Sequence, residues 1–380
     1  MPGVRRKSTS TRECCVHENT RRGCDTFHWT TRWEILTSGR DISNINVNNP
    51  TEDVTVTGNE PMTNPSAAAA PLITVAICTR NRAGLLQRAI ASVLPQLTGE
   101  AEVLIVDNVS TDSTPEVAAS FTAANPRVKV WREAEMGLSA ARNAALKLAH
   151  GRYVLFLDDD ATAEPGWLAA YLRFLSAPPS EKIAVVGGTV FPNFEITPPK
   201  WVNTDITFDL GNSPKILPHR DSPWGCNIAY RRELALELGQ FDTRLGRKGE
   251  QMMSREESDL NLRLQDVGYE IWWLPGAAIR HLVPASRLKV RAMMRAWFSE
   301  GRSIAIQRLK SRRGIRDRCL YRAGRIVVAP FHALAHFLAM LLLLPLSRAK
   351  AIGHLFQTCR NCGMAWQLFV NASDGKIDAH

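Results

Sequence analysis

The chain has 380 residues, 45% hydrophobic and 22% charged, which is the composition of a globular protein with one large domain or two and not of a disordered chain. Its eight cysteines are scattered without a regular framework, which excludes a disulfide scaffold and indicates a reducing compartment. The formal net charge of +10 lies in the last quarter, where residues 285–380 hold 17 basic and 4 acidic side chains, and such a tail suits nucleic acid or anionic lipid.

The first 70 residues show neither helical nor strand periodicity. They are rich in Thr, Ser, Asn and Arg, so we expect a disordered extension over residues 1–70. Residues 1–25 are basic and polar without an apolar core, and we therefore expect no secretory signal. Met62 lies just before the first predicted strand. We hypothesise that translation begins at Met62, and a peptide from residues 1–61 in the native protein would refute this.

From Leu72 onward, apolar strands alternate with helices. Short apolar runs predict strands at 73–78, 102–106, 128–131 and 153–157. This alternation predicts a mainly parallel sheet flanked by helices, in an α/β domain over residues 71–286. Polar side chains follow several strands at their carboxyl ends, which is where open α/β sheets bind nucleotides. No G-x-G-x-x-G follows the first strand and no G-x-x-x-x-G-K-[ST] occurs, so the sequence indicates neither a dinucleotide fold nor a P-loop.

Three adjacent carboxylates, Asp158, Asp159 and Asp160, follow the last of these strands directly. The strand is a continuous apolar run, which is typical of a buried central strand. Adjacent carboxylates repel one another unless a cation lies among them. A divalent metal with oxygen ligands is therefore the expected guest, and the alternative is a solvated acidic turn.

Further motifs follow one another in a fixed order. They are Val75-Ala76-Ile77-Cys78-Thr79-Arg80-Asn81-Arg82, Val106-Asp107-Asn108-x-Ser110-x-Asp112, Gly137-Leu138-Ser139-x-x-Arg142-Asn143, Phe156-Leu157-Asp158-Asp159-Asp160, Trp224-Gly225-Cys226-Asn227, Glu256-Glu257-x-Asp259 and Pro275-x-Ala277-x-x-x-His281. In this order and spacing, over about residues 71–310, the chain resembles the family 2 glycosyltransferases, which have the GT-A fold of nucleotide-diphospho-sugar transferases. It resembles in particular the branch that acts in exopolysaccharide assembly.

The resemblance implies a nucleotide-sugar site. Its members would be Thr79, Arg82, Asp107, Arg142, Asp158 and Asp159. Asp107 would contact the nucleobase and Asp158 the ribose. A turn carboxylate is the structural alternative for Asp107, and a surface helix arginine is the alternative for Arg142. The resemblance also implies a Mg²⁺ or Mn²⁺ ion held by Asp160, Asp158 and His281, although a lone histidine can equally be a hydrogen-bonding core residue.

The second acidic motif would supply the catalytic base. The usual family pattern is Glu-Asp-x-Asp, so Glu257 replaces an aspartate here, and Glu256 and Asp259 are the alternatives to Glu257. Acids at a helix start also favour the positive end of the helix dipole, which is their structural alternative. The acceptor would be bordered by Trp224, Cys226 and Asn227. The loop 246–249 would close over the diphosphate.

The last part of the chain, residues 287–380, reads as a basic helical tail. Residues 326–346 within it are nearly all apolar, and about 20 residues are enough to span a bilayer. Two prolines and two histidines in this segment make a re-entrant or interfacial helix nearly as strong an alternative as a spanning helix, and a buried core helix is the further alternative. The basic flank indicates an anionic cytoplasmic leaflet. The C-x-x-C at 359–362 has no second pair and is a weak metal motif.

The resemblance implies an inverting, metal-dependent, hexosyltransferase-like enzyme of polysaccharide biosynthesis. It would move a sugar from a nucleotide-sugar donor to a hydroxyl of a glycan or lipid-linked acceptor. We expect it at the cytoplasmic face of a membrane, peripheral or single-pass, with no nucleic acid partner. The alternative is a non-catalytic module of the same fold that binds nucleotide sugars or nucleic acid. A nucleotidyltransferase would have less use for the second acidic motif.

Overall fold

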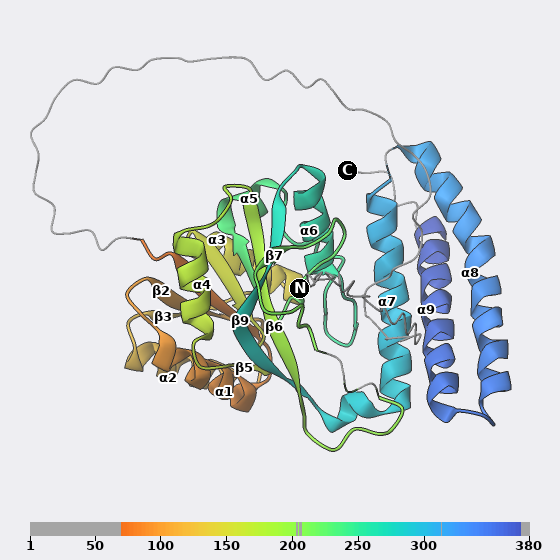
Figure 1. Ribbon diagram of the computed structural model, residues 1–380, viewed down its shortest axis with the longest axis horizontal. Helices are drawn as coiled ribbons and strands as arrows, with labels where there is room; N and C mark the ends of the chain where they lie inside the picture. Colours follow the sequence, from red (N-terminus) through yellow and green to blue (C-terminus); the bar gives the residue numbers. More distant parts are fainter. Residues whose placement is uncertain (1–69, 203, 205–206, 313, 374–380) are drawn as a thin grey trace, which may run out of the picture. The chain divides into compact units, whose positions relative to one another are not determined.

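The computed structural model describes residues 70–202, 204, 207–312 and 314–373. The expectations for residues 1–69, including the start at Met62, fall outside the described residues. Within them the chain forms a nine-stranded sheet with helices packed on its faces, followed by three long helices (Figure 1). The predicted α/β class is confirmed.

The first half of the sheet is parallel, as the alternating pattern predicts. Its strands are β1 (Ile73–Thr79), β2 (Ala101–Asp107), β3 (Val128–Arg132) and β4 (Tyr153–Leu157), in the order β3-β2-β1-β4. The connecting helices are α1 (Ala83–Val93), α2 (Thr114–Ala124) and α3 (Leu138–Leu148), with a short 3-10 turn η1 (Leu94–Gln96) after α1. Asp112 Oδ1 accepts the Thr114 N–H at 3.0 Å where α2 begins.

The second half of the sheet is mixed, but the longest ladders of the whole sheet are parallel, so the expectation of a mainly parallel sheet is confirmed. It is made of β5 (Ala161–Ala163), β6 (Ile183–Phe194), β7 (Lys215–Ile216), β8 (Asn227–Arg231) and β9 (Glu270–Val283). β8 runs antiparallel to β4 and β6, and β9 runs parallel to β6 but antiparallel to β5 and β7. The remaining elements are α4 (Trp167–Ser176), α5 (Arg232–Glu237), α6 (Glu256–Asp266) and η2 (Ala285–Leu288).

The core lies on both faces of the sheet, and successive side chains of β4 point alternately into the two halves. Tyr153, Leu155 and Leu157 join the cluster that includes α1 and α4, whereas Val154 and Phe156 join the one that includes α3, α5 and α6. This is the two-residue period of a strand buried on both faces. Each large apolar side chain buried here contributes about 1.5–3 kcal/mol of transfer free energy. The carboxyl end of β4 is therefore firmly positioned, and the acidic triad with it.

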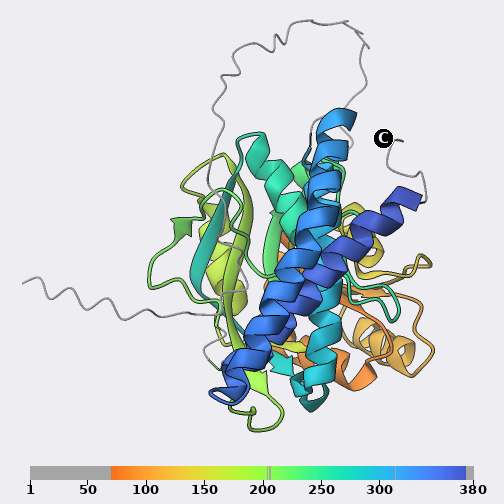
Figure 2. The same cartoon turned by 90° about the vertical axis from the view of Figure 1, so that its right-hand side faces the viewer.

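The three long helices are α7 (Val290–Lys310), α8 (Ile315–Leu343) and α9 (Arg348–Ser373). The expected helical character of the tail is confirmed as far as Ser373, and the apolar segment forms most of α8. α9 packs against both α7 and α8 and lies between them (Figures 1 and 2). The division of the chain at residue 287 stays a prediction.

Candidate active site

The carboxyl ends of β1, β2 and β4 lie side by side and bring the predicted nucleotide-site residues together. Parallel pairing sets Thr79 of β1 opposite Asp107 of β2, and β4 pairs with the other edge of β1. Asp158 is half-buried, and Asp159 and Asp160 are buried. The edge thus gathers four carboxylates within a few residues of the three strand ends.

Arg82, at the start of α1, holds two acids of the triad. Its Nη1 donates to Asp159 Oδ1 at 2.8 Å and to Asp160 Oδ2 at 3.1 Å, and Thr79 Oγ1 donates to Asp159 Oδ2 at 2.8 Å. Burial raises the pKa of Asp159 to about 6, against the opposing charge of Arg82. Asp159 therefore orients Thr79 and Arg82, and both of its oxygens are used by protein donors.

Asp160 lies among three basic side chains. His281 Nε2 is 3.1 Å from Asp160 Oδ1, and Arg287 Nη2 donates to Oδ2 at 3.4 Å. The β5–β9 pairing explains the approach of His281, because it sets Ala161 opposite His281. Burial acts to raise the pKa of Asp160, but hydrogen bonding to His281 and the charges of His281, Arg287 and Arg82 hold it below its usual value.

A divalent metal fits the residues at this point. Asp158 Oδ2 lies 3.9 Å from His281 Nε2, and Asp160 shares the same imidazole. Two carboxylates and an imidazole are ligands that Mg²⁺ and Mn²⁺ accept. Cys226 also places its sulfur within 4.8 Å of candidate ligand atoms of Asp158 and His281. Burial raises the pKa of the Cys226 thiol well above its usual range, so the neutral thiol is a poor ligand for such an ion.

Asp107 has one carboxylate oxygen that a ligand can use. Oδ1 accepts the Ser110 N–H at 3.2 Å, and Arg132 Nε lies 3.9 Å from Oδ2. Among the described residues, the buried Oδ2 has no hydrogen-bond partner. Because an unsatisfied buried acceptor is costly, Oδ2 is the atom expected to accept a hydrogen bond from a bound base.

Arg142 connects the triad to the second acidic motif. Its Nη2 donates to Asp158 Oδ1 at 3.1 Å and its Nη1 to Glu256 Oε1 at 2.7 Å, while Nη2 also donates to the Gly225 carbonyl at 3.0 Å. The side chain is buried, and its guanidinium lies over the rings of Phe156 and Phe241. This differs from the expected place against the nucleotide, because the terminal nitrogens are already used by protein acceptors. Arg142 instead joins two acidic segments 98 residues apart in sequence, from Asp158 to Glu256.

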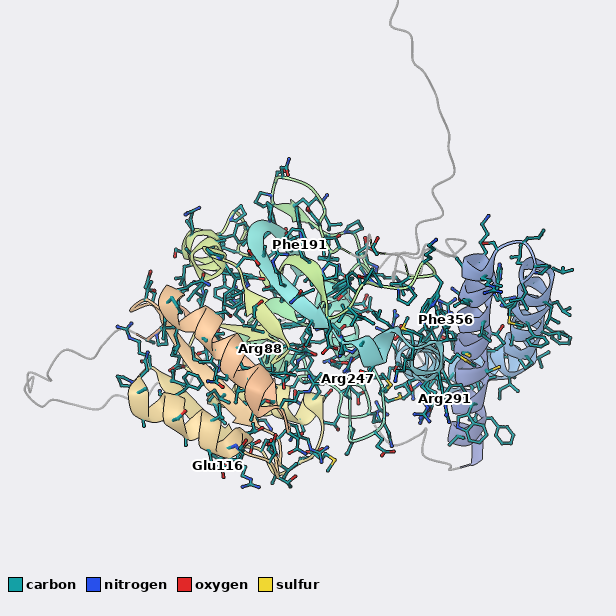
Figure 3. The ribbon with its side chains drawn as sticks, turned by 90° about the horizontal axis from the view of Figure 1, so that it is seen from below. Arg88, Glu116, Phe191, Arg247, Arg291 and Phe356 are labelled. Carbon is teal, nitrogen blue, oxygen red and sulfur yellow. The ribbon has the colours of Figure 1, made fainter. Side chains whose placement is uncertain are left out.

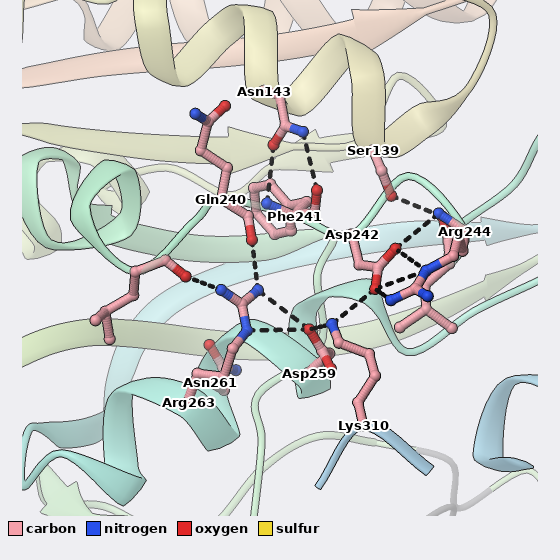
Figure 4. Close-up of polar contacts among 12 residues, drawn as sticks. Ser139, Asn143, Gln240, Phe241, Asp242, Arg244, Asp259, Asn261, Arg263 and Lys310 are labelled. Carbon is pink, nitrogen blue, oxygen red and sulfur yellow. Dashed lines mark hydrogen bonds and ion pairs between the residues drawn. The ribbon is translucent and has the colours of Figure 1, made fainter. Parts of the chain in front are cut away.

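The three candidate bases differ in what they contact. Glu256 is buried and paired with Arg142, and Asp259 is buried and bonded to Arg263 at 3.1 Å and Lys310 at 2.8 Å (Figure 4). Asp259 therefore lies in an ion-pair network that occupies its carboxylate, as Arg142 occupies that of Glu256. Glu257 is half-buried and forms no ion pair in the described part of the chain. Burial, with the neighbouring charge of Glu256, raises the pKa of Glu257 to about 8.

Helix α7 holds the turn that precedes Glu257. Arg255 has a left-handed backbone with φ of 71°, a conformation that costs a non-glycine residue on the order of 1–3 kcal/mol. Its Nη1 donates to Glu300 Oε1 at 2.7 Å and its Nε to Gln307 Oε1 at 2.9 Å. Glu300 also accepts the Ser254 hydroxyl. The sequence reasoning missed Glu300, Gln307 and Arg287, because each lies in a stretch that reads only as an amphipathic basic tail.

The three predicted acceptor residues differ in how deeply they are buried. Trp224 is half-buried against Phe208, with ring centroids 5.7 Å apart, and Cys226 is buried. Asn227 is fully buried: Trp167 Nε1 and Tyr171 OH donate to its Oδ1, and its amide donates to the Thr189 and Ala277 carbonyls. These bonds leave the Asn227 amide no capacity for a sugar, which corrects its placement in the acceptor site.

The loop 246–249 is anchored to the start of α3, where the Leu138 N–H donates to the Arg247 carbonyl at 2.8 Å. Burial lowers the pKa of Arg287, and the nearby positive charge of Arg247 lowers it further. Figure 3 shows Arg247 on the side of the sheet domain nearest α7, the helix that carries Arg291. A basic border thus adjoins the carboxylates, as a site for an anionic diphosphate requires.

Comparisons with known proteins find similar sequences and a similar fold. A family model described as "Glycosyl transferase family 2" matches residues 74–239. The chain is 26% identical over 216 residues to a glucosyl-dolichyl phosphate glucuronosyltransferase of Haloferax volcanii, covering 55% of this chain and 68% of that protein. It is 25% identical over 240 residues to the succinoglycan biosynthesis protein ExoM of Rhizobium meliloti, covering 61% and 73%.

A solved structure is similar to the chain in fold. It is a mannosyltransferase of Pyrobaculum calidifontis in complex with GDP-Man and Mn²⁺, with a TM-score of 0.52 at 18% identity, and the match covers 83% of this chain and 92% of that one.

Proposed function

We propose that the chain is a family 2 glycosyltransferase that transfers a sugar from a nucleotide-sugar donor to a hydroxyl of a glycan or lipid-linked acceptor, with inversion at the anomeric carbon; the family model over residues 74–239 and the similar glycosyltransferases support this. The observation that carries the proposal is Arg142, which bonds Asp158 on one side and Glu256 on the other. One guanidinium group thereby joins Asp158 of the proposed donor site to Glu256, the neighbour of the proposed base. Relatives in glycan and polysaccharide biosynthesis support the same reaction class.

The donor nucleotide would lie along the ends of β1 and β2. Asp107 Oδ2 would accept a base N–H, with Thr79 and Arg82 beside it, and Asp158 would face the ribose. Arg82 and Arg287, which both contact Asp160 Oδ2, would bring positive charge to the diphosphate. These interactions would orient the sugar so that its anomeric carbon points away from the sheet edge.

We propose that Asp158, Asp160 and His281 hold Mg²⁺ or Mn²⁺, and the similar mannosyltransferase, which was solved in complex with Mn²⁺, supports this. Such an ion, when bound, neutralises the charge that develops on the leaving diphosphate. The protein's own contribution is to fix the three ligands on β4 and β9, which are joined through β5. The Leu282 N–H, which donates to the Asp160 carbonyl at 2.8 Å, fixes the same spacing.

Glu257 would act as the general base. Its carboxylate takes the proton of the acceptor hydroxyl while that oxygen bonds to the anomeric carbon, and the bond from that carbon to the diphosphate oxygen breaks. One displacement from the face opposite the leaving group inverts the configuration. The raised pKa of Glu257 suits this role, because a base is most effective when its pKa lies near the working pH. Glu256 stays paired with Arg142 and positions the turn.

Trp224 and Cys226 remain the proposed border of the acceptor. The acceptor could be membrane-borne, since one similar protein is named for glucosyl-dolichyl phosphate. We propose that the enzyme works at the cytoplasmic face of a membrane, to which residues 326–346 attach it, and not on nucleic acid.

A panel of nucleotide sugars tests the proposal. Purified full-length protein is heated with each nucleotide sugar, with and without Mn²⁺ or Mg²⁺, and slow donor hydrolysis is followed in parallel. One donor should raise the melting temperature and be hydrolysed only with metal, and Asp107→Asn should weaken both effects. No stabilisation and no hydrolysis with any donor would contradict the proposed activity.

A further inference from the structure

Helix α8 presents a continuous apolar face to the outside. Its exposed large side chains recur at helical spacing and lie on one side of the helix: Leu320, Val327, Phe331, Leu334, Leu338 and Leu342. Within the described residues, α8 is the one helix long and apolar enough to cross a membrane, yet only 11% of its most apolar stretch is buried. A monomeric soluble protein rarely exposes a strip of this length.

The exposed arc of α8 between Ile326 and Leu343 carries one polar side chain, His332. Phe331 is 66% exposed and Leu342 is 73% exposed. The opposite side of α8 is different, because the small side chains of Ala329 and Ala333 are buried there against α9, whose Thr358 hydroxyl donates to the Ala333 carbonyl. A helix that lies on a bilayer needs a polar side that faces away from the lipid. For α8 that side is covered by α9, which in turn packs on α7.

Helix α9 is fixed to α7 and so cannot follow α8 into a bilayer. Gly301 of α7 and Gly363 of α9 lie where the two backbones touch: a Cβ added at Gly301 would collide with the Arg360 carbonyl, and one added at Gly363 with the Phe298 carbonyl. α9 also carries polar residues on its packed faces, among them Asn361, which is buried.

Helix α7 in turn is bonded to the active-site domain. Lys310 Nζ donates to Asp259 Oδ2 at 2.8 Å, and Glu300 bonds Arg255 at 2.7 Å. If α8 crossed a bilayer, its end at Leu343 would lie on the far side, and α9 would have to return through the hydrocarbon with its polar side chains. The packing of α9 on α7 excludes that path, so both ends of α8 lie on the side of the active-site domain.

Basic side chains lie near both ends of α8. The exposed Arg316 and the half-buried Arg322 and Arg325 lie in its first three turns, and the exposed Arg348 and Lys350 follow its end. Anionic headgroups complement both groups at once. A second copy of the chain would not, because a two-fold α8–α8 contact in either direction sets basic ends against basic ends.

We propose that α8 lies in the plane of an anionic bilayer, with the Phe331 and Leu338 face in the acyl region and the basic ends at the headgroups, and does not cross it. The inference rests on the proposed membrane attachment but not on sugar transfer. α8 packs on α9, α9 packs on α7, and Glu300 of α7 bonds Arg255. The bilayer is then held at a fixed position relative to the base Glu257.

Vesicle flotation tests the surface without any sugar donor. Full-length protein should float with vesicles of phosphatidylglycerol and phosphatidylcholine and at least tenfold less with phosphatidylcholine alone. Phe331→Ser with Leu338→Ser should reduce flotation at least tenfold, whereas the control Val267→Ser, at an exposed valine after α6, should not change it. Equal flotation of both variants would overturn the proposal. So would a concentration-dependent dimer that forms without vesicles and is lost in the double variant.

Labelling distinguishes a helix that lies on the bilayer from one that spans it. An impermeant maleimide is added to sealed vesicles carrying Ala349→Cys, and peptide mass spectrometry compares position 349 with the native exposed Cys319. Both should be labelled from the side of the active-site domain. Protection of position 349 until detergent is added, with Cys319 labelled, would overturn the in-plane placement. Neither result depends on catalysis, so a failure here is separate from a failure of the proposed transferase activity.

Discussion

Replacing Glu257 by Gln removes the proposed base and leaves its shape. General-base catalysis contributes about 10²–10⁴-fold, so kcat should fall by that factor, which is about 3–5 kcal/mol of transition-state stabilisation. Donor affinity should hold within about twofold, because Glu257 lies on the Glu256 side of Arg142 and not at Asp107. Asp266→Asn on the same helix, at an exposed residue bonded to His219, is the matched control.

The pH profile sharpens this prediction. With a pKa of about 8 in the folded protein, about one-tenth of Glu257 is ionised at pH 7 and about one-hundredth at pH 6. The rate of the wild-type enzyme should therefore rise about tenfold per unit at low pH and level off above about pH 8, whereas the residual rate of Glu257→Gln should be nearly flat. A radiolabelled sugar-transfer assay from pH 5.5 to 9 measures both. A Glu257→Gln rate within threefold of wild type, with the same pH slope, would refute the assignment.

The contacts of Glu300, Asp107 and Glu257 each lead to a further prediction. Glu300→Gln should lower kcat more than it raises KM for the donor, since it weakens the 2.7 Å bond that holds Arg255, and a charge-assisted bond is worth about 1.5–3 kcal/mol. In a double-mutant cycle with Arg255→Lys the two effects on kcat should be non-additive, and additive effects would contradict the coupling. Asp107→Asn should raise the donor KM at least tenfold with kcat nearly preserved, and an unchanged KM in the same assay would remove Asp107 from the donor site. The pKa of Glu257 is about 8 in the folded protein and 4.5 in the unfolded chain, so between these pH values the folded protein holds a proton that the unfolded chain has lost. This group's contribution to stability is therefore complete below pH 4.5 and is lost as the pH rises to about 8. Glu257→Gln should melt at a higher temperature than wild type at pH 8.5 but not at pH 4.5, and equal melting temperatures at both pH values would contradict the raised pKa.

The sequence predicts the first half of the fold well because its signals are local. Apolar runs of strand length alternate with helices between Ile73 and Leu157, and the observed strands extend the predicted ones by one residue or none at each end. The second half is harder to predict, because its pairing is set by distant contacts. β9 continues to Val283 through the left-handed Gly276 and two shifts in register with β6, and no short window encodes that path.

The site was predictable where a motif places residues at strand ends. The triad, Asp107 and Glu257 stand where their motifs indicate, although their roles remain proposals. Asn227 was misplaced because it begins a strand: a polar residue there can face the core when Trp167 and Tyr171 supply donors. The bridge from Arg142 to Glu256 spans 114 residues and leaves no trace in composition or period.

If the acidic triad and Glu257 serve one sugar diphosphate, both must meet the same bound donor. A crystal structure with Mn²⁺ and a non-hydrolysable nucleotide-sugar analogue, with the metal located by anomalous scattering, shows whether they do. We expect Mn²⁺ at coordination distance, about 2.1 Å, from oxygens of Asp158 or Asp160, with Glu257 on the face of the anomeric carbon opposite the diphosphate. A metal bound away from these carboxylates, or a sugar with the Arg142–Glu256 pair between it and Glu257, would contradict the proposed mechanism.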